Sequence, residues 1–197
     1  MDVPLRCECG KLRGTATRLS RSAGTRIVCY CDDCQAFARF LGRPDITDRW
    51  GGTDIFQMAP SRVRIEHDDD ALRCVRLSDK GMYRWYCGHC KTPVGNTVGP
   101  RVPFVGLVHS FMDHAASGAS RDDFLGKPVG YVQTRFAIGA PPHGGPISTV
   151  RATVRSLMKL TKWWVTGAGV PSPFFDEKTG APRITPRVLS SDERRAL

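Results

Sequence analysis

The sequence predicts a mainly β protein built from antiparallel sheets, with an amphipathic helix near its C-terminus. Between residues 5 and about 112, short segments rich in β-branched and aromatic residues alternate with Gly, Pro, Ser and Asp. This is the pattern of strands joined by turns. Apolar residues recur with a helical period in one short segment and one long one. Seven of the eight cysteines lie in tight clusters, so we expect metal ions to pin the sheets together.

The strands and one short helix follow in order along the first part of the chain. Residues 25–31 (TRIVCYC) predict a strand, and residues 32–42 (DDCQAFARFLG) predict a helix that Gly42 caps. Asp32 and Asp33 fit the first turn of this helix, because the helix dipole favours negative charge there. Further strands are expected at residues 54–58, 62–67, 72–77, 82–87 and 104–112.

Changes in composition divide the chain into three parts. We expect a metal-binding β domain over residues 1–115, a Gly/Pro-rich connector over 116–147, and a helix with an irregular tail over 148–197. Ser148 and Gly167 suit the two ends of the helix. The tail is expected to pack on the domain, because it has apolar side chains to bury: Phe174, Phe175, Ile184, Val188 and Leu189.

The C-terminal helix carries an apolar stripe (Val150, Val154, Leu157, Met158 and Trp164) and a basic one (Arg151, Arg155, Lys159 and Lys162). We expect the apolar stripe to dock on the β domain. Two other roles fit the same pattern. Trp163 and Trp164 beside basic residues suit contact with a membrane surface or a partner. A lid that offers Arg or Lys to an anionic substrate is the third role.

Composition and charge set wider limits on location and partners. No apolar run of the 197 residues approaches the length of a membrane span, and the first residues contain no apolar stretch of a secretory signal. We therefore expect a cytoplasmic protein. The net charge of +10 permits anionic partners. The basic residues are scattered and the aromatic ones are not interleaved with them, which argues against nucleic acid.

The spacing of the cysteines favours metal ligands over disulfides. A reducing compartment disfavours disulfides, and cysteines one residue apart pair only with strain. Zinc binds thiolates and takes four ligands in structural sites. The simplest set of four is Cys7, Cys9, Cys87 and Cys90, which come from two turns far apart in the sequence. A zinc ion bound by all four would join an early strand to a late one.

The remaining cluster is Cys29-x-Cys31-x-x-Cys34. Three thiolates would leave one coordination position on zinc to water or substrate, as in catalytic sites. Cys34 lies in the first turn of the predicted helix, where backbone N–H groups and the dipole favour a thiolate. An eighth ligand would instead close the site.

Three residues are candidates for an additional ligand or for an acid–base role. Cys74 lies in a predicted strand, where a lone cysteine is typically a buried core thiol. His89 lies between two zinc cysteines and reads as a loop residue. His109 lies on the last predicted strand, which is able to face the second cluster.

Four motifs in order, CECG, CYCDDC, WYCGHC and GLVHSFMD, cover residues 5 to about 115. They resemble the glutathione-dependent formaldehyde-activating enzyme family. Tyr30 and Lys91 stand where that family usually has His and Gly. The resemblance implies a β-tent, a set of antiparallel sheets pinned by zinc. It also implies a structural zinc on the four-cysteine set and a catalytic zinc on Cys29, Cys31 and Cys34.

The resemblance further implies a zinc-dependent carbon–sulfur lyase. Its substrate would be a thiol–aldehyde adduct such as S-hydroxymethylglutathione, and its partner a small thiol such as glutathione. The alternatives are a non-catalytic zinc module that binds a protein or nucleic acid, and a redox or metal-handling protein that uses the same thiols. A protein ligand in the fourth position of the second site would favour the module.

Overall fold

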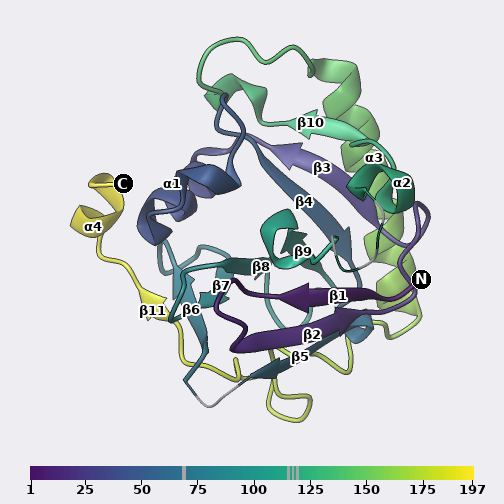
Figure 1. Ribbon diagram of the computed structural model, residues 1–197, viewed down its shortest axis with the longest axis vertical. Helices are drawn as coiled ribbons and strands as arrows, with labels where there is room; N and C mark the ends of the chain where they lie inside the picture. Colours follow the sequence, from purple (N-terminus) through teal and green to yellow (C-terminus); the bar gives the residue numbers. More distant parts are fainter. Residues whose placement is uncertain (68–69, 115, 117, 119) are drawn as a thin grey trace.

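A computed structural model of the chain describes residues 1–67, 70–114, 116, 118 and 120–197 (Figure 1). The protein is a mixed α/β structure with largely antiparallel sheets, and helices and strands take up about 28% and 27% of it. The expected antiparallel sheets are present, but the protein is mixed α/β and not mainly β, because helices are as abundant as strands. Helical turns form in several segments that local composition marks as loops, and the C-terminal helix is 20 residues long.

The smaller sheet has three strands in the order β1-β2-β5. Strands β1 (Val3–Arg6), β2 (Leu12–Ala16) and β5 (Val63–His67) pair antiparallel. Alternate side chains of β1 are buried and exposed, as expected of a strand with one face on a core. Glycine is required in β2, because a Cβ on Gly14 would lie 2.1 Å from the Arg64 carbonyl oxygen of β5.

The larger sheet has eight strands in the order β10-β3-β4-β9-β8-β7-β6-β11. Its inner strands pair antiparallel, and the two edge strands pair parallel to their neighbours. The strands are β3 (Thr25–Cys29), β4 (Thr53–Met58), β6 (Leu72–Arg76), β7 (Tyr83–Cys87), β8 (Pro93–Thr97), β9 (Val105–Val108), β10 (Gly130–Val132) and β11 (Arg187–Val188).

The main core joins side chains of the two sheets. Trp85 of β7, Phe56 of β4 and Leu12 of β2 are among its fully buried members. Phe174 and Phe175 of the tail are buried in the same cluster, and Phe174 lies 5.0 Å from Trp85 between ring centroids. The tail then adds β11 to the sheet and ends in α4 (Ser191–Arg195).

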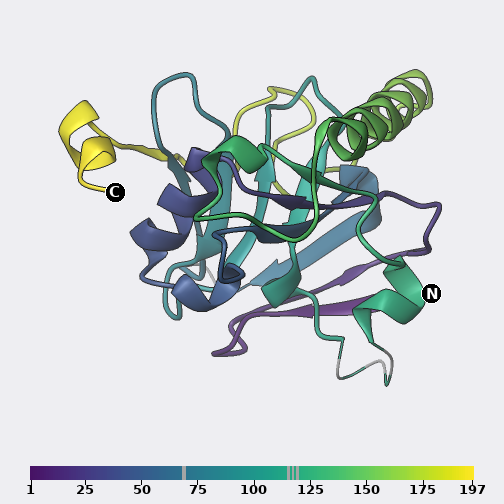
Figure 2. The same cartoon turned by 90° about the horizontal axis from the view of Figure 1, so that it is seen from above.

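The short helix after the second cysteine cluster is confirmed as α1 (Asp32–Leu41). Asp32 and Asp33 occupy its first turn, and Gly42 ends it with a φ of 65°, a left-handed conformation that glycine adopts without steric cost. Phe37 and Leu41 bury the inner face of α1. Helices α1 and α3 lie on opposite sides of the molecule (Figures 1 and 2).

Short 3₁₀ helices connect several strands: η1 (Pro44–Ile46), η2 (Pro60–Arg62), η3 (His109–Phe111) and η5 (Thr134–Phe136). Helix η3 shortens the strand expected at 104–112, which ends at Val108. His109 therefore lies on a helical turn and not on a strand. The stretch expected as a connector contains α2 (Arg121–Leu125), β10 and η5, with Ser120 capping α2.

Helix α3 (Pro146–Val165) begins two residues before the expected start. Ser148 does not cap it. Its hydroxyl instead accepts a hydrogen bond from the Tyr131 N–H of β10 at 2.9 Å. The helix crosses β10 closely, because a Cβ on Gly130 would lie 2.5 Å from the Ala152 Cβ. Among the described residues, no helix is long and apolar enough to cross a membrane.

The expected docking of the apolar stripe is wrong. Helix α3 packs through Ala152 and Trp163, whereas Val150, Val154, Leu157, Met158 and Trp164 are all exposed. Three of the four basic residues, Arg151, Arg155 and Lys159, reach back to the domain and donate hydrogen bonds to backbone carbonyls, whereas Lys162 is exposed. Loop carbonyls that no strand satisfies attract these donors, and a helical period cannot reveal that.

Candidate metal centres

The four-cysteine set predicted from the sequence comes together in the structure. The Sγ atoms of Cys7, Cys9, Cys87 and Cys90 all lie within 4.8 Å of one another. The Cys7 and Cys9 sulfurs are 3.5 Å apart, and those of Cys9 and Cys87 are 3.7 Å apart. Four thiols at these separations suit the tetrahedral coordination of a structural zinc.

Two turns deliver these four thiols. The turn after β1 contains Gly10 with a φ of 75°, and the turn after β7 contains Lys91 with a φ of 59°. The turns also touch directly, because the Thr92 hydroxyl accepts a hydrogen bond from the Glu8 N–H at 3.2 Å. The first strand of the small sheet is thereby joined to β7 and β8 of the large one.

Hydrogen bonds prepare part of this cluster for a metal ion. Although burial opposes ionisation, hydrogen bonds from the Thr92 hydroxyl and nearby backbone N–H groups lower the pKa of Cys90 to about 6. Burial raises the pKa of Cys87 to about 12. Metal binding requires the thiolate form, so a bound cation would have to displace the Cys87 proton.

The three-cysteine cluster is also confirmed as a group, since the Cys29, Cys31 and Cys34 sulfurs lie within 4.8 Å of one another. Cys29 ends β3, Cys31 is the N-cap of α1, and Cys34 lies in the first turn of α1. The Cys31 sulfur accepts a hydrogen bond from the Cys34 N–H at 3.4 Å. The junction of strand and helix thus aims all three thiols at one point.

A buried arginine that the sequence reasoning missed neighbours this cluster. Arg84 of β7 is 2% exposed, donates a hydrogen bond to the Asn96 side chain at 3.3 Å and pairs with Asp33 at 3.5 Å. Hydrogen bonds from the Cys29 and Cys31 thiols lower the pKa of Cys34, and the charge of Arg84 lowers it further. An Arg inside the otherwise apolar segment MYRWYC was the available signal.

Thr53 of β4 is a second neighbour that the sequence did not reveal. It pairs directly with Cys29 across the antiparallel ladder, so the two side chains leave the sheet on the same face. The Thr53 hydroxyl is buried without a hydrogen-bond partner. An unsatisfied buried hydroxyl costs free energy. A hydrogen bond from Thr53 to a ligand or to a sulfur of the cluster would recover that cost.

A model of a family of unknown function, DUF6151, matches residues 1–185. The chain belongs to this family. A comparison with curated proteins found no match. The family match shows no link to the glutathione-dependent formaldehyde-activating enzymes. Both cysteine clusters lie inside the region that the family shares with this chain.

Residues 186–197 lie outside the family match. They nevertheless contact the first turn of α1, which carries Cys34 of the second cluster. Arg194 of α4 pairs with Asp32 and, at 3.0 Å, with Asp33. Asp33 in turn faces Arg84. A chain of alternating charges therefore connects the C-terminal segment of this protein to Cys34.

The other candidate ligands are not among the grouped ligand atoms of either cluster. Cys74 is 3% exposed and packs in the main core, where burial raises its pKa to about 12. His89 is exposed in the turn between its two cysteines. His109 is half-buried, and its Nδ1 lies 3.3 Å from the Asp54 carbonyl oxygen. None of the three belongs to either group of candidate ligands among the described residues.

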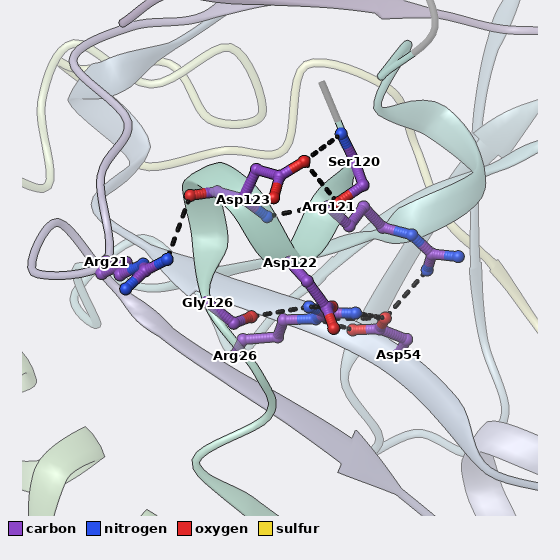
Figure 3. Close-up of polar contacts among 8 residues, drawn as sticks. All are labelled: Arg21, Arg26, Asp54, Ser120, Arg121, Asp122, Asp123 and Gly126. Atoms are coloured by element: carbon purple, nitrogen blue, oxygen red, sulfur yellow. Dashed lines mark hydrogen bonds and ion pairs between the residues drawn. The ribbon is translucent and has the colours of Figure 1, made fainter.

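A polar cleft of about 450 Å³ lies on another part of β3 and β4, lined by Arg26, Tyr30, Asp54 and Arg121 among others. Figure 3 shows that four of its charged residues, Arg26, Asp54, Arg121 and Asp122, are joined by ion pairs. Arg26 donates to the Asp54 carboxylate, to Asp122 and to the Gly126 carbonyl, and Arg121 donates to Asp54 at 2.8 Å. This network fixes α2 against the sheet, so its charges serve the fold.

Proposed function

We propose that the chain is a two-zinc enzyme that makes or breaks a carbon–sulfur bond in a thiol–aldehyde adduct such as S-hydroxymethylglutathione. One observation carries this proposal. Four thiols form a complete ligand set, whereas the other group holds three thiols and no fourth His, Cys or carboxylate among the described residues. A three-thiol set leaves a position for an exogenous ligand.

The residues of the second cluster suit a thiol substrate. Zinc bound there would supply a fourth coordination position that holds a sulfur atom as a thiolate. Cys29, Cys31 and Cys34 would hold the ion, and three thiolates with one Zn²⁺ sum to a single negative charge. Arg84, buried beside Cys34, offsets that charge. The Thr53 hydroxyl, on the same face of the sheet as Cys29 and without a hydrogen-bond partner, is our candidate donor to a substrate sulfur or hydroxymethyl oxygen.

The reaction is a reversible addition. In the cleavage direction, the bond between sulfur and the hydroxymethyl carbon breaks and its electron pair stays on sulfur. The hydroxyl proton passes to water as the carbonyl forms, and the thiolate takes up a proton when it is released. The products are the free thiol and formaldehyde. Because formaldehyde is already electrophilic, positioning of the two reactants supplies most of the acceleration expected in the reverse direction.

The fold supports the same proposal. Two largely antiparallel sheets joined by a four-thiol cluster agree with the β-tent that the sequence resemblance implies. Eight free cysteines fit a reducing location such as the cytoplasm. These features are shared with non-catalytic zinc modules, so the chemistry rests on the three-thiol cluster alone.

The test is exchange between free formaldehyde and its glutathione adduct, measured by NMR with the zinc-loaded protein. We expect acceleration that Cys31→Ala abolishes, because that variant loses one of three ligands. Cys74→Ala, which removes a thiol from the core outside both clusters, is the matched control and should keep the activity.

The decisive contrary result is absence of acceleration when metal analysis finds zinc in both clusters. This result would refute glutathione–formaldehyde chemistry for this chain and favour a non-catalytic zinc module. Acceleration that survives in Cys31→Ala would remove the chemistry from this cluster.

A further inference from the structure

Helix α3 presents a continuous apolar face to solvent. Its members are between 50% and 84% exposed: Ile147, Val150, Val154, Leu157, Met158, Trp164 and Val165. Ile147, Val150, Val154 and Met158 follow one another at three or four residues, and Leu157, Trp164 and Val165 fall on the same side at 3.6 residues per turn. Scattered exposed apolar residues are normal, but a contiguous set along a whole helix marks an interaction surface.

The opposite side of α3 is fixed to the domain, so the apolar face cannot turn inward. Ala152 and Trp163 are buried. Arg151 donates to the Val129 carbonyl at 2.7 Å, Arg155 donates to the Arg21 carbonyl at 2.6 Å, and Lys159 donates to the Ser22 carbonyl. Helix α3 lies along the outer edge of the molecule in both views (Figures 1 and 2).

An open groove of about 1070 Å³ runs beside this face. Four basic residues line it together with apolar side chains of α3: Lys127, Arg151, Arg155 and Lys159. No acidic residue is among its lining residues, and the α3 sequence itself contains neither Asp nor Glu. The surface is therefore apolar in the middle and positively charged along one flank.

This charge pattern selects the occupant. A second copy of the chain would bring two basic flanks together, and like charges repel across a contact. An anionic lipid surface offers the opposite charge and an apolar interior at once. Trp164 is 72% exposed at the C-terminal end of the face, and Trp side chains favour the boundary between headgroups and acyl chains.

We propose that α3 docks the protein on an anionic membrane surface. The helix lies parallel to the bilayer, with its apolar face at the level of the acyl boundary. The basic residues beside that face keep their positive charge while they donate to backbone carbonyls, and this charge attracts the anionic headgroups. This inference is independent of the chemistry proposed for the cysteine clusters, since α3 carries none of the candidate ligands.

The test is co-sedimentation of the zinc-loaded chain with vesicles of about two parts phosphatidylcholine to one part phosphatidylserine. Pure phosphatidylcholine vesicles are the lipid control. The test variant is the double change Val154→Glu and Met158→Glu, which lowers the net charge by two. Lys80→Glu, exposed in the turn between β6 and β7, lowers it by the same amount away from α3.

We expect the wild-type chain to bind the anionic vesicles and the double variant to bind more than about tenfold more weakly, since each apolar side chain gains free energy on leaving water. Lys80→Glu should bind nearly as well as wild type. Tryptophan emission should shift to shorter wavelength on vesicles, and Trp164→Phe should lose most of that shift.

Three outcomes would overturn the proposal. One is no binding by the folded wild-type chain. Another is equal weakening in Lys80→Glu and the double variant, which would reduce the effect to net charge. The last is a dimer in solution that the double variant dissociates without any vesicle binding, which would assign the face to self-association.

Discussion

Arg84→Met should weaken metal binding at the three-cysteine cluster and spare the four-cysteine cluster. Arg84 is a buried cation beside a group that becomes negative when it holds Zn²⁺ on three thiolates. Met preserves much of the apolar stem and removes only the charge and the donors. The substitution therefore separates electrostatic support from packing.

The size of the effect follows from Coulomb's law and the neighbours. Two unit charges about 4 Å apart interact by about 4 kcal/mol at an effective dielectric constant of about 20. Asp33, 3.5 Å from Arg84 and 44% exposed, already takes up part of the charge. Loss of groups that support metal ligands typically lowers affinity about 10–100-fold, and we expect a value in that range.

The assay is competition for zinc between the protein and a chromophoric chelator. The four-cysteine cluster, which the substitution should spare, is the internal reference. Arg84→Lys should recover part of the affinity because it keeps the charge. Arg64→Met, which removes an exposed charge from β5, should change neither cluster. Unchanged affinity in folded Arg84→Met, or equal loss at both clusters, would refute the reasoning.

Three further predictions rest on single side chains. Cys9→Ala should lower the thermal midpoint of the zinc-loaded protein at least about 5 °C more than Cys31→Ala does, because only the cluster that contains Cys9 joins the two sheets. Calorimetry of both variants checks this, and equal midpoints would contradict it. Thr53→Val should raise the free energy of unfolding of the metal-free protein by about 1 kcal/mol, because it removes an unsatisfied buried hydroxyl. Urea unfolding measures this, and a lower free energy of unfolding in the variant would mean that the hydroxyl has a hydrogen-bond partner. Burial and the charge of Arg121 lower the pKa of His114 from 6.5 to about 4. As the pH falls from about 6.5 to about 4, His114 therefore takes up a proton in the unfolded chain but not yet in the folded protein, and the free energy of unfolding decreases over that range. His114→Gln should flatten that slope in urea titrations, and an unchanged slope would count against it.

Local signals in the sequence were sufficient for the metal clusters and α1. Cysteine spacing limits which thiols can reach one point, and the Asp residues and Gly42 define a helix through contacts within a few residues. Both features depend on atoms that are close in the chain. They were predictable for that reason.

The rest depended on contacts between distant segments. The amphipathic period of α3 identified two faces but not which one packs, because backbone carbonyls from distant segments accept hydrogen bonds from Arg151 and Arg155. Arg84 and Thr53 acquired their roles only when β7 and β4 came beside the cysteines of β3 and α1. The edge strand β10 pairs parallel to β3 across about a hundred residues, and its three residues carry no signal that names this partner.

The four-cysteine cluster has a consequence for the unfolded chain. Cys9 and Cys87 are 78 residues apart in sequence, so one metal ion held by both closes a loop of that length. In the chain-entropy description, a cross-link of this span raises the free energy of an unfolded chain that retains it by about 4–5 kcal/mol at room temperature. Small domains are stable by only about 5–15 kcal/mol. Removal of the ion would then leave the protein a much smaller margin against destabilising substitutions elsewhere in the sequence.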